Sequence, residues 1–441
     1  MATSKKHLKN TLGKRSFWRK PWIYLAILAA LGLLAFAAMQ VPAVATRARN
    51  LYSKIYYKLN PPSENVFGPS QQGTLDASVL ASLTAMAPTA TPQPEQTPTP
   101  EGAEAQPTDI PEPTATPMPI PTAFALEGMG LEYQSFNNCG PANLSMNITY
   151  WGWPSTQDQT KAGLRTHNDD RNVMLSEMRD YVIEKTNLSA LIRFGGTLDT
   201  LKRLVTGGFP VLLERGHTSP EDGWMGHYSI VTAYDDAART VRIPDTLLGE
   251  MSLGYDELLL DWAHFDSIYL VVYPPEREAE VLALLGADAD PAVNLQNTLD
   301  QVTARIQQVS GRELFFAWYS RGSVLVEMRN YIEAAQAFDQ AFAVYAELPA
   351  GERPWRITWY QVGAYPAYYY TGRYQDCLDI ALQTITNTSI PSLPETWYWA
   401  GRAASALQKS DDAVTYYQKA LEYQPGWALP LEGLAELGVQ P

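Results

Sequence analysis

Cysteine, histidine and positive charge are scarce in this sequence. Its 441 residues include two cysteines and five histidines, and the formal net charge is -14. Two cysteines cannot build the disulfide framework that small secreted domains need. Neither residue type shows the spacing of metal ligands, so we expect no metal and no cofactor. Nucleic-acid binding requires a basic surface that neutralises phosphates, and the acidic balance argues against that class of partner.

Charged residues are also absent from Trp22 to Val41, a run of twenty mostly apolar residues. At about 1.5 Å per residue this run matches the roughly 30 Å hydrocarbon core of a bilayer. More basic residues precede it than follow it, which predicts a cytoplasmic tail (1–21), one transmembrane helix (22–41) and an extracytoplasmic remainder, in keeping with a bacterial envelope. Ala43-Val44-Ala45 has the A-x-A pattern of a cleavage site, so a removed signal peptide is the alternative.

Lys and Arg are missing from the segment between Pro61 and Pro121, which is rich in proline and threonine and acidic. Such a composition cannot bury enough apolar surface to fold, and repeated proline favours extended chain. We therefore expect residues 42–122 to be an extracytoplasmic stalk and a disordered linker that holds the next domain away from the bilayer.

One of the two cysteines begins a helical pattern in "NNCGPANLSMNITYWGW". Pro141 suits the first turn of a helix, and Leu144 and Ile148 recur at helical spacing. Cys139 is thus expected at a helix N-terminus, where unpaired N–H groups and the helix dipole stabilise a thiolate. Two interpretations stay open at this point: a reactive nucleophile, or a structural cysteine near a helix cap.

A thiolate nucleophile needs a base and a group that orients the base. His227 opens the apolar run "HYSIVTAYDD", and this position at the start of a strand is the one that we favour for the base. Asp245 follows the next strand, "ARTVRIPD", and is our candidate for the orienting acid. Asp235 and Asp236 are alternatives, although they read as turn residues. The remaining histidines are less favoured: His7, His167, His217 and His264.

The segments "YQSFNNCGPA", "GHYSIVTAYDD" and "VRIPDT" together resemble the papain-like cysteine peptidases related to the bacteriocin-processing, double-glycine-leader peptidases. The resemblance is closest to their stand-alone, extracytoplasmic relatives and covers about residues 125–275. It implies an α+β papain-like domain, which we place at 123–277. It also implies Cys139 as nucleophile, His227 as general base, Asp245 as orienting acid and Gln134 as oxyanion-hole residue. Gln134 lies five residues before the cysteine, whereas six is the commoner spacing.

The resemblance implies a peptide or protein substrate and a cysteine peptidase that forms a thioester at Cys139. The alternative is a catalytically inactive papain-like domain that binds a peptide or serves as a scaffold. Transfer of the acyl group to an amine instead of water is a third option. Transporter-fused relatives carry a nucleotide-binding domain, but this chain has no G-x-x-x-x-G-K-[ST] motif, so an exporter role is not supported.

The C-terminal part, from about residue 312, is helical and repetitive and resembles tetratricopeptide repeats. Trp, then Gly four residues later, then Ala twelve residues after that, occurs twice: Trp318, Gly322 and Ala334, and Trp397, Gly401 and Ala413. We expect a helical connector at 278–311 and an all-α repeat domain at 312–441. Cys377 falls where a small residue is needed between helices, which accounts for it without chemistry.

Repeats of this kind commonly bind a partner on their concave face. Tyr360, Tyr368, Tyr369 and Tyr370 supply more aromatic surface than packing requires, so we expect a protein partner there. The alternative is that the repeats only pack on the peptidase domain.

Overall fold

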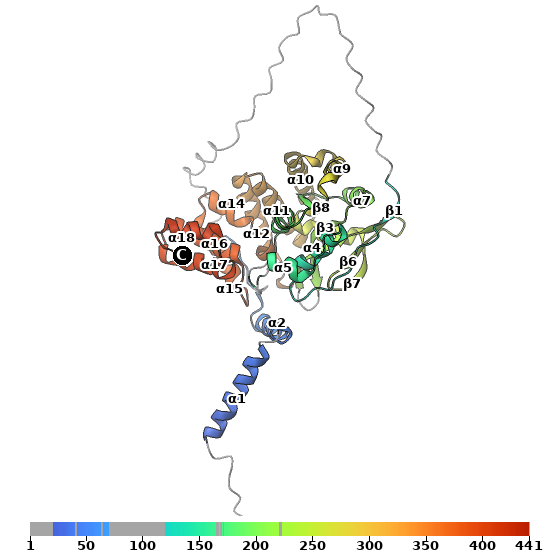
Figure 1. Cartoon of the computed structure of the whole chain (residues 1–441). Helices are drawn as coiled ribbons and strands as arrows, with labels where there is room; N and C mark the ends of the chain where they lie inside the picture. The colour runs from blue at the N-terminus through green and yellow to red at the C-terminus, as the bar shows by residue number, and fades with distance from the viewer. Residues whose placement is uncertain are drawn as a thin grey trace, which may run out of the picture. The chain divides into compact units, whose positions relative to one another are not determined.

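The computed structural model describes residues 21–39, 42–62, 65–69, 120–164, 167, 170, 172–219 and 223–440. The chain divides into two units, Met1–Asn60 and Pro61–Pro441. Figure 1 shows the chain with its helices and strands labelled.

The first unit contains two helices, α1 (Pro21–Met39) and α2 (Pro42–Leu59). α1 covers most of the predicted transmembrane segment 22–41. Within the part of the chain that the structure describes, however, no helix is both long and apolar enough to cross a membrane. The predicted transmembrane helix is therefore not supported by the structure. The predicted cytoplasmic tail lies, apart from Pro21, outside the described residues.

The second unit begins with two antiparallel sheets of four strands each, in the orders β1-β5-β6-β7 and β2-β8-β3-β4. The strands of the first sheet are β1 (Ala123–Ala125), β5 (Ala233–Asp235), β6 (Thr240–Asp245) and β7 (Gly249–Gly254). Those of the second are β2 (Ser189–Arg193), β3 (Val211–Ser219), β4 (Gly223–Val231) and β8 (Tyr269–Tyr273).

Alternate residues of β3 enter two separate cores. Leu212 packs with α4 (Cys139–Tyr150) and α6 (Leu175–Lys185) on one face of the sheet. Val211 and Leu213 pack with α7 (Leu198–Thr206), α8 (Tyr255–Trp262) and α9 (Glu278–Leu285) on the other face. This is the two-residue period of a strand buried on both sides. One further helix, α5 (Gln157–Leu164), lies beside α4. The α+β prediction for this region agrees with the structure.

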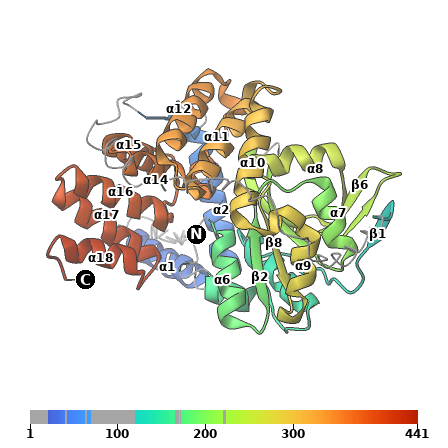
Figure 2. The ribbon, with the colours of Figure 1, turned by 90° about the horizontal axis from the view of Figure 1, so that it is seen from above.

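Helices follow to the end of the chain and stack in chain order (Figure 2). They are α10 (Pro291–Ile306), α11 (Gly311–Glu327), α12 (Tyr331–Glu347), α13 (Ile357–Tyr360), α14 (Ala364–Tyr370), α15 (Tyr374–Thr386), α16 (Pro394–Ala406), α17 (Ser410–Tyr423) and α18 (Ala428–Glu436).

The predicted small and large positions of the repeats meet in space. A Cβ on Gly322 would lie 2.8 Å from the Phe338 ring, and one on Gly401 would lie 2.6 Å from the Tyr417 ring. Each glycine therefore admits an aromatic ring of the following helix. Cys377 is fully buried on α15, in the packing role predicted for it.

The predicted aromatic surface of the repeats is largely absent. Tyr368 is completely buried, and its hydroxyl donates a hydrogen bond to Asp339 Oδ1 (3.0 Å). Tyr360 and Tyr369 are half-buried, and only Tyr370 is exposed, at 44%. The expectation of an aromatic partner surface is wrong for most of this tyrosine cluster, because segments distant in the sequence cover it: Asp339 of α12 covers Tyr368, and Trp224 and Phe265 pack on Tyr360.

Part of the predicted disordered linker is ordered against the repeats. Phe67 is 2% exposed, and its ring centroid lies 5.7 Å from that of Phe342 and 4.7 Å from that of Tyr345. The Gly68 amide donates to Gln383 Oε1 (3.1 Å). The linker prediction is therefore wrong at residues 65–69. The Phe67 side chain, in an otherwise polar segment, is buried against the rings of Phe342 and Tyr345 in the repeats. Residues 70–119 lie outside the described part.

The repeats are attached to the sheet region through buried polar groups. His264 Nε2 lies 3.1 Å from Glu313 Oε1 of α11, and its ring stacks on Phe316 at a centroid distance of 3.9 Å. Arg356 donates to the carbonyl of Trp224 in β4 (3.0 Å). Because β4 also carries His227, the first repeats are packed against the strand that holds a predicted site residue.

Candidate active site

The turn before α4 sets the position of Cys139. Asn137 has a φ of 53°, a left-handed conformation that asparagine tolerates better than most residues, and Asn138 is fully buried as the N-cap. Cys139 is the first residue of α4 and is half-buried. The next residue is a glycine, Gly140, because any side chain at this position would collide with α6: a Cβ there would lie 2.6 Å from Met178 Cε. The predicted helix N-terminus at Cys139 agrees with the structure.

His227 and Asp245 come from neighbouring strands that belong to different sheets. His227 Nε2 lies 2.9 Å from Asp245 Oδ2, and both side chains are buried. The other oxygen, Oδ1, accepts the backbone N–H groups of Leu247 (2.8 Å) and Leu248 (2.9 Å). The carboxylate is thus held at both oxygens, and His227 Nδ1 is the nitrogen left for the thiol. β4 begins at Gly223, so His227 lies within a strand and not at its start as predicted.

The Cys139 thiol and the His227 imidazole act on each other electrostatically, and each changes the pKa of the other. Burial by itself raises the pKa of the Cys139 thiol. The hydrogen bond and charge of His227, with the backbone N–H groups of Tyr228 and Gly140, outweigh it, so the pKa falls below its ordinary value. For His227, burial lowers the pKa, but hydrogen bonds to Asp245 and Cys139 raise it to about 9. These directions favour a thiolate beside an imidazolium.

The pKa of Asp245 is also displaced. Burial raises it, but the hydrogen bond and charge of His227 and the amides of Leu248 and Leu247 hold it well below the usual range. The carboxylate therefore stays ionised at neutral pH, where His227 carries a proton.

Arg215 is a residue of this site that the sequence analysis did not identify. It is opposite His227 in the β3–β4 ladder and is 2% exposed. Its Nη2 lies 3.7 Å from Asp245 Oδ2, its Nη1 lies 3.1 Å from Asp261 Oδ2, and its Nε donates to Ser229 Oγ (3.0 Å). The guanidinium thus stabilises the ionised carboxylate of Asp245, and that carboxylate in turn orients the His227 ring. The sequence offered one indication of this role: Arg215 is a charged residue within the apolar run "FPVLLERG", which precedes the run that contains His227.

Gln134 is tied to the residue after Asp245. Its backbone N–H donates to the carbonyl of Thr246 (2.8 Å), and its side-chain Oε1 accepts the Thr246 hydroxyl (2.7 Å). Asn143 of α4 approaches the same hydroxyl at 3.5 Å. Since Oε1 is the acceptor, the Nε2 amide is the end that remains to donate. No distance between Gln134 and Cys139 supports its predicted oxyanion role directly.

The other histidines take different places. His217 lies on β3, and its ring centroid is 5.9 Å from that of His227. Burial, followed by the charge of His227, lowers the pKa of His217, which favours its neutral form. His264 lies in the contact with the repeats, and His7 is outside the described residues. No group of His, Cys, Asp and Glu in the described segments could hold a metal ion.

Residues 126–272 match the model of the Peptidase_C39 like family. The match begins just after β1 and covers the other strands, except Tyr273 at the end of β8, and the residues just described. We call this region the C39-like domain. A second family, the tetratricopeptide repeat, matches residues 394–427, which contain α16 and α17. No curated protein matches the chain.

Two solved structures are similar to the C39-like domain. One is described as a C39-like peptidase from Bacillus anthracis; it is 15% identical, with a TM-score of 0.28, over 34% of this chain and 96% of that chain. The other is a double glycine motif protease from an AMS/PCAT transporter in complex with the leader peptide; it is 16% identical, with a TM-score of 0.27, over 34% of this chain and 94% of that chain. At these scores the likeness adds nothing to the family match.

Replacing Asp245 by asparagine is expected to narrow the pH range of the thiolate–imidazolium pair. Loss of the carboxylate lowers the pKa of His227 from about 9, and the weaker imidazolium raises the pKa of Cys139. Each shift should be about one to three pKa units. The pH profile of iodoacetamide labelling at Cys139 measures both limits. Asp235→Asn, in the β5–β6 turn, is the matched control and should leave the profile unchanged; an equal effect of both variants would refute the assignment of Asp245.

Removing Arg215 is expected to destabilise the domain. Arg215→Ala leaves Asp245 as a buried carboxylate without this cation, and breaking a buried ion pair on one side costs about 3–5 kcal/mol. Urea denaturation of the full chain measures the change in the free energy of unfolding. Arg239→Ala, which removes an exposed pair with Asp256, should have little effect. A loss for Arg215→Ala no larger than for this control would contradict the supporting role.

Proposed function

We propose that the chain is a cysteine peptidase in which Cys139 is the nucleophile, His227 the acid and base, and Asp245 the residue that orients His227. The observation that carries the proposal is the position of His227, whose Nε2 lies 2.9 Å from Asp245 Oδ2 and whose charge acts on Cys139, where it lowers the pKa of the thiol against the effect of burial. The match of residues 126–272 to a peptidase family supports it.

In the first step the Cys139 thiolate attacks the carbonyl carbon of the scissile peptide bond, and a C–S bond forms. The negative charge moves to the carbonyl oxygen. When this tetrahedral intermediate collapses, the C–N bond breaks and the His227 imidazolium gives its proton to the departing amine. The products of this step are a free amine and a thioester at Cys139, with a neutral imidazole.

In the second step His227 takes a proton from a water molecule, whose oxygen attacks the thioester carbonyl. The C–S bond then breaks, a carboxylic acid leaves, and the thiolate–imidazolium pair is restored. The negatively charged oxygen of both intermediates needs hydrogen-bond donors. The orphan N–H groups at the start of α4 and the Gln134 Nε2 amide, held by Thr246, are the donors that we assign to this role.

The substrate class that we propose is a peptide or protein. The repeat region packs directly on the C39-like domain through His264 and Arg356, so it is placed to take part in substrate binding. We propose that role for the repeats, in preference to a separate partner on the tyrosine cluster, because that cluster is largely buried.

We also propose a location outside the cytoplasm, which rests on the sequence pattern of residues 1–41 alone. Intact cells treated with an added protease test it. Loss of the C39-like domain supports the proposal, and protection of the domain until the cells are lysed contradicts it.

Replacing Cys139 by alanine should abolish peptide hydrolysis, by roughly a thousandfold or more, because the nucleophile is lost. Hydrolysis of a mixed peptide library, followed by mass spectrometry, measures the change. Cys377→Ala is the matched control and should retain activity, since burial raises the pKa of that thiol far above its usual value.

Iodoacetamide labelling separates the peptidase proposal from an inactive domain. Cys139 should react much faster than Cys377 at neutral pH, and the labelling of Cys139 should slow about tenfold or more in His227→Ala, because the thiolate loses the imidazolium that stabilises it. Equal, slow labelling of both cysteines in the unaltered chain would contradict an activated nucleophile and would favour the inactive, peptide-binding alternative.

A further inference from the structure

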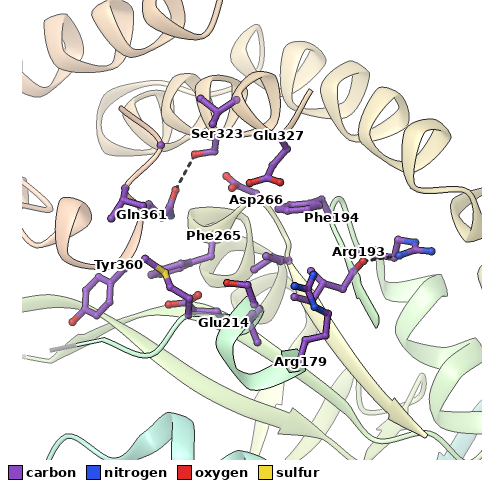
Figure 3. Close-up of a pocket in the computed structure, with 18 of the residues that line it drawn as sticks. Arg179, Arg193, Phe194, Glu214, Phe265, Asp266, Ser323, Glu327, Tyr360 and Gln361 are labelled. Carbon is purple, nitrogen blue, oxygen red and sulfur yellow. Dashed lines mark hydrogen bonds between the residues drawn. The ribbon is translucent and has the colours of Figure 1, made fainter. Parts of the chain in front are cut away.

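A cavity of about 620 Å³ lies between the C39-like domain and the first repeats (Figure 3). The C39-like domain contributes the start of α6, strand β2, Glu214 of β3 and the segment Phe265–Asp266. The repeats contribute α11 and the segment from Tyr360 to Gly363. Neither region alone encloses this space, so the cavity exists because the two are packed together.

Three carboxylates from separate elements line this cavity: Glu214, Asp266 and Glu327. In the described part of the chain, none of the three forms an ion pair with a Lys, Arg or His side chain. In Figure 3, Asp266 and Glu327 project toward each other across the space. Burial is the main cause that raises the pKa of each, to about 7 for Asp266 and well above the ordinary value for Glu214.

The two arginines that line the cavity are engaged elsewhere. Arg193 donates to the backbone carbonyls of Asp288 (2.7 Å), Ala289 (2.5 Å) and Ile192 (2.7 Å). Arg179 forms an ion pair with its neighbour Asp180 at 2.7 Å. Neither guanidinium lies within ion-pair distance of the three carboxyl groups, and Arg179 acts on Glu327 only through its charge, which partly offsets the effect of burial on the pKa. The three carboxyl groups therefore have no paired cation, and a bound cation would favour their ionised forms.

Asp266 has an oxygen without a partner. The residue is 8% exposed, and its Oδ1 has no hydrogen-bond partner among the described residues. A buried acceptor that is left unsatisfied costs about 1–3 kcal/mol. Asp266 also has a φ of 55°, so the backbone conformation is one that aspartate tolerates but rarely adopts. A ligand in the cavity that carries a hydrogen-bond donor could therefore supply the partner that Asp266 Oδ1 lacks.

The remaining walls are mostly apolar. They include Leu175, Ile192, Phe194, Phe265, Val326 and Trp399. A bare metal ion would need several oxygen ligands at about 2.3–2.6 Å and no apolar wall, and no such group is present in the described residues. Apolar walls with carboxylates match a cation carried on an aliphatic stem, which buries its methylene groups and keeps its charged end on the acids.

We infer that this cavity is a binding site for an organic cation, an ammonium or guanidinium group on an aliphatic stem, supplied by a lysine or arginine side chain of a peptide. The site lies next to strand positions that adjoin His227 and Arg215. Tyr360 contacts Gly226, the residue before His227, and Glu214 is adjacent to Arg215 on β3. Its use as a specificity pocket rests on the proposed peptidase function, but the binding itself does not.

Binding should release protons. The ionisable groups that line the cavity are Arg179, Arg193, Glu214, Asp266, Glu327 and Tyr360. Of these, the carboxyl groups are the ones whose pKa a bound cation lowers back toward ordinary values. The cation binds their ionised forms, so affinity should rise as the pH increases through about 7, the pKa of Asp266.

Isothermal titration calorimetry of the full chain carrying Cys139→Ala tests the inference without depending on catalysis. The probes are Nα-acetyl-arginine methylamide, its lysine counterpart, and the citrulline counterpart, which has nearly the shape of arginine without the charge. We expect the arginine or the lysine probe to bind at least tenfold more tightly than the citrulline probe. Equal affinity of all three probes, or no binding of any, would overturn the inference.

Substitutions of the carboxyl groups test which residues bind the cation, and a free amine tests whether the ligand is a peptide side chain. Asp266→Asn and Glu327→Gln should each weaken the cationic probe about tenfold or more, whereas Asp256→Asn and Glu347→Gln, outside the cavity, should not. Asparagine also tolerates the left-handed conformation at position 266. Agmatine that binds tenfold more tightly than the blocked arginine would overturn the assignment to a peptide side chain and indicate a free amine. Because Cys139 is absent throughout, failure of the peptidase proposal leaves these outcomes unaffected.

Discussion

The buried guanidinium of Arg215 is the interaction on which the arrangement of the site depends. It lies between Asp245 and Asp261, and it is opposite His227 in the β3–β4 ladder. A carboxylate as buried as Asp245 is costly without compensating charge and hydrogen bonds. These charges and hydrogen bonds come from Arg215, from His227 and from the backbone amides of Leu247 and Leu248. The fold itself therefore stabilises the ionised form of Asp245, independently of any reaction.

The same ladder links the site to the repeats. Trp224, three residues before His227, stacks on Phe265 and packs against Phe316 of α11, while its carbonyl accepts a hydrogen bond from Arg356. Gly226 leaves room for the ring of Tyr360. The repeat region therefore closes over one end of the strand that bears the histidine, and the acidic cavity is a consequence of that closure. The C39-like domain without the repeats would lack the part of the cavity wall that α11 and the segment from Tyr360 to Gly363 form.

The regular parts of the structure could be predicted because their signals are local. The helix at Cys139, the β5–β6 turn at Asp235 and the small–large pairs of the repeats follow from neighbouring residues and from repeat spacing. Two of the predictions that failed concern burial. Phe67 was assigned to a disordered linker, and Tyr368 to an exposed surface, because nothing in their own segments shows that Phe342 or Asp339 lies across from them.

The sequence by itself identified the candidate residues for the proposed chemistry: one cysteine at a helix N-terminus, one histidine in an apolar strand segment, and one acid at the end of the next predicted strand. Their identity depends on local pattern and on resemblance to a family. Only the tertiary structure decided that Arg215 stands behind Asp245, and that Glu214, Asp266 and Glu327 share one cavity. Both the ion pair and the cavity bring together residues that are far apart in the sequence. The free energy of an ion pair depends on how far its charged groups are removed from water, and these groups are buried only after the C39-like domain and the repeats have folded and packed.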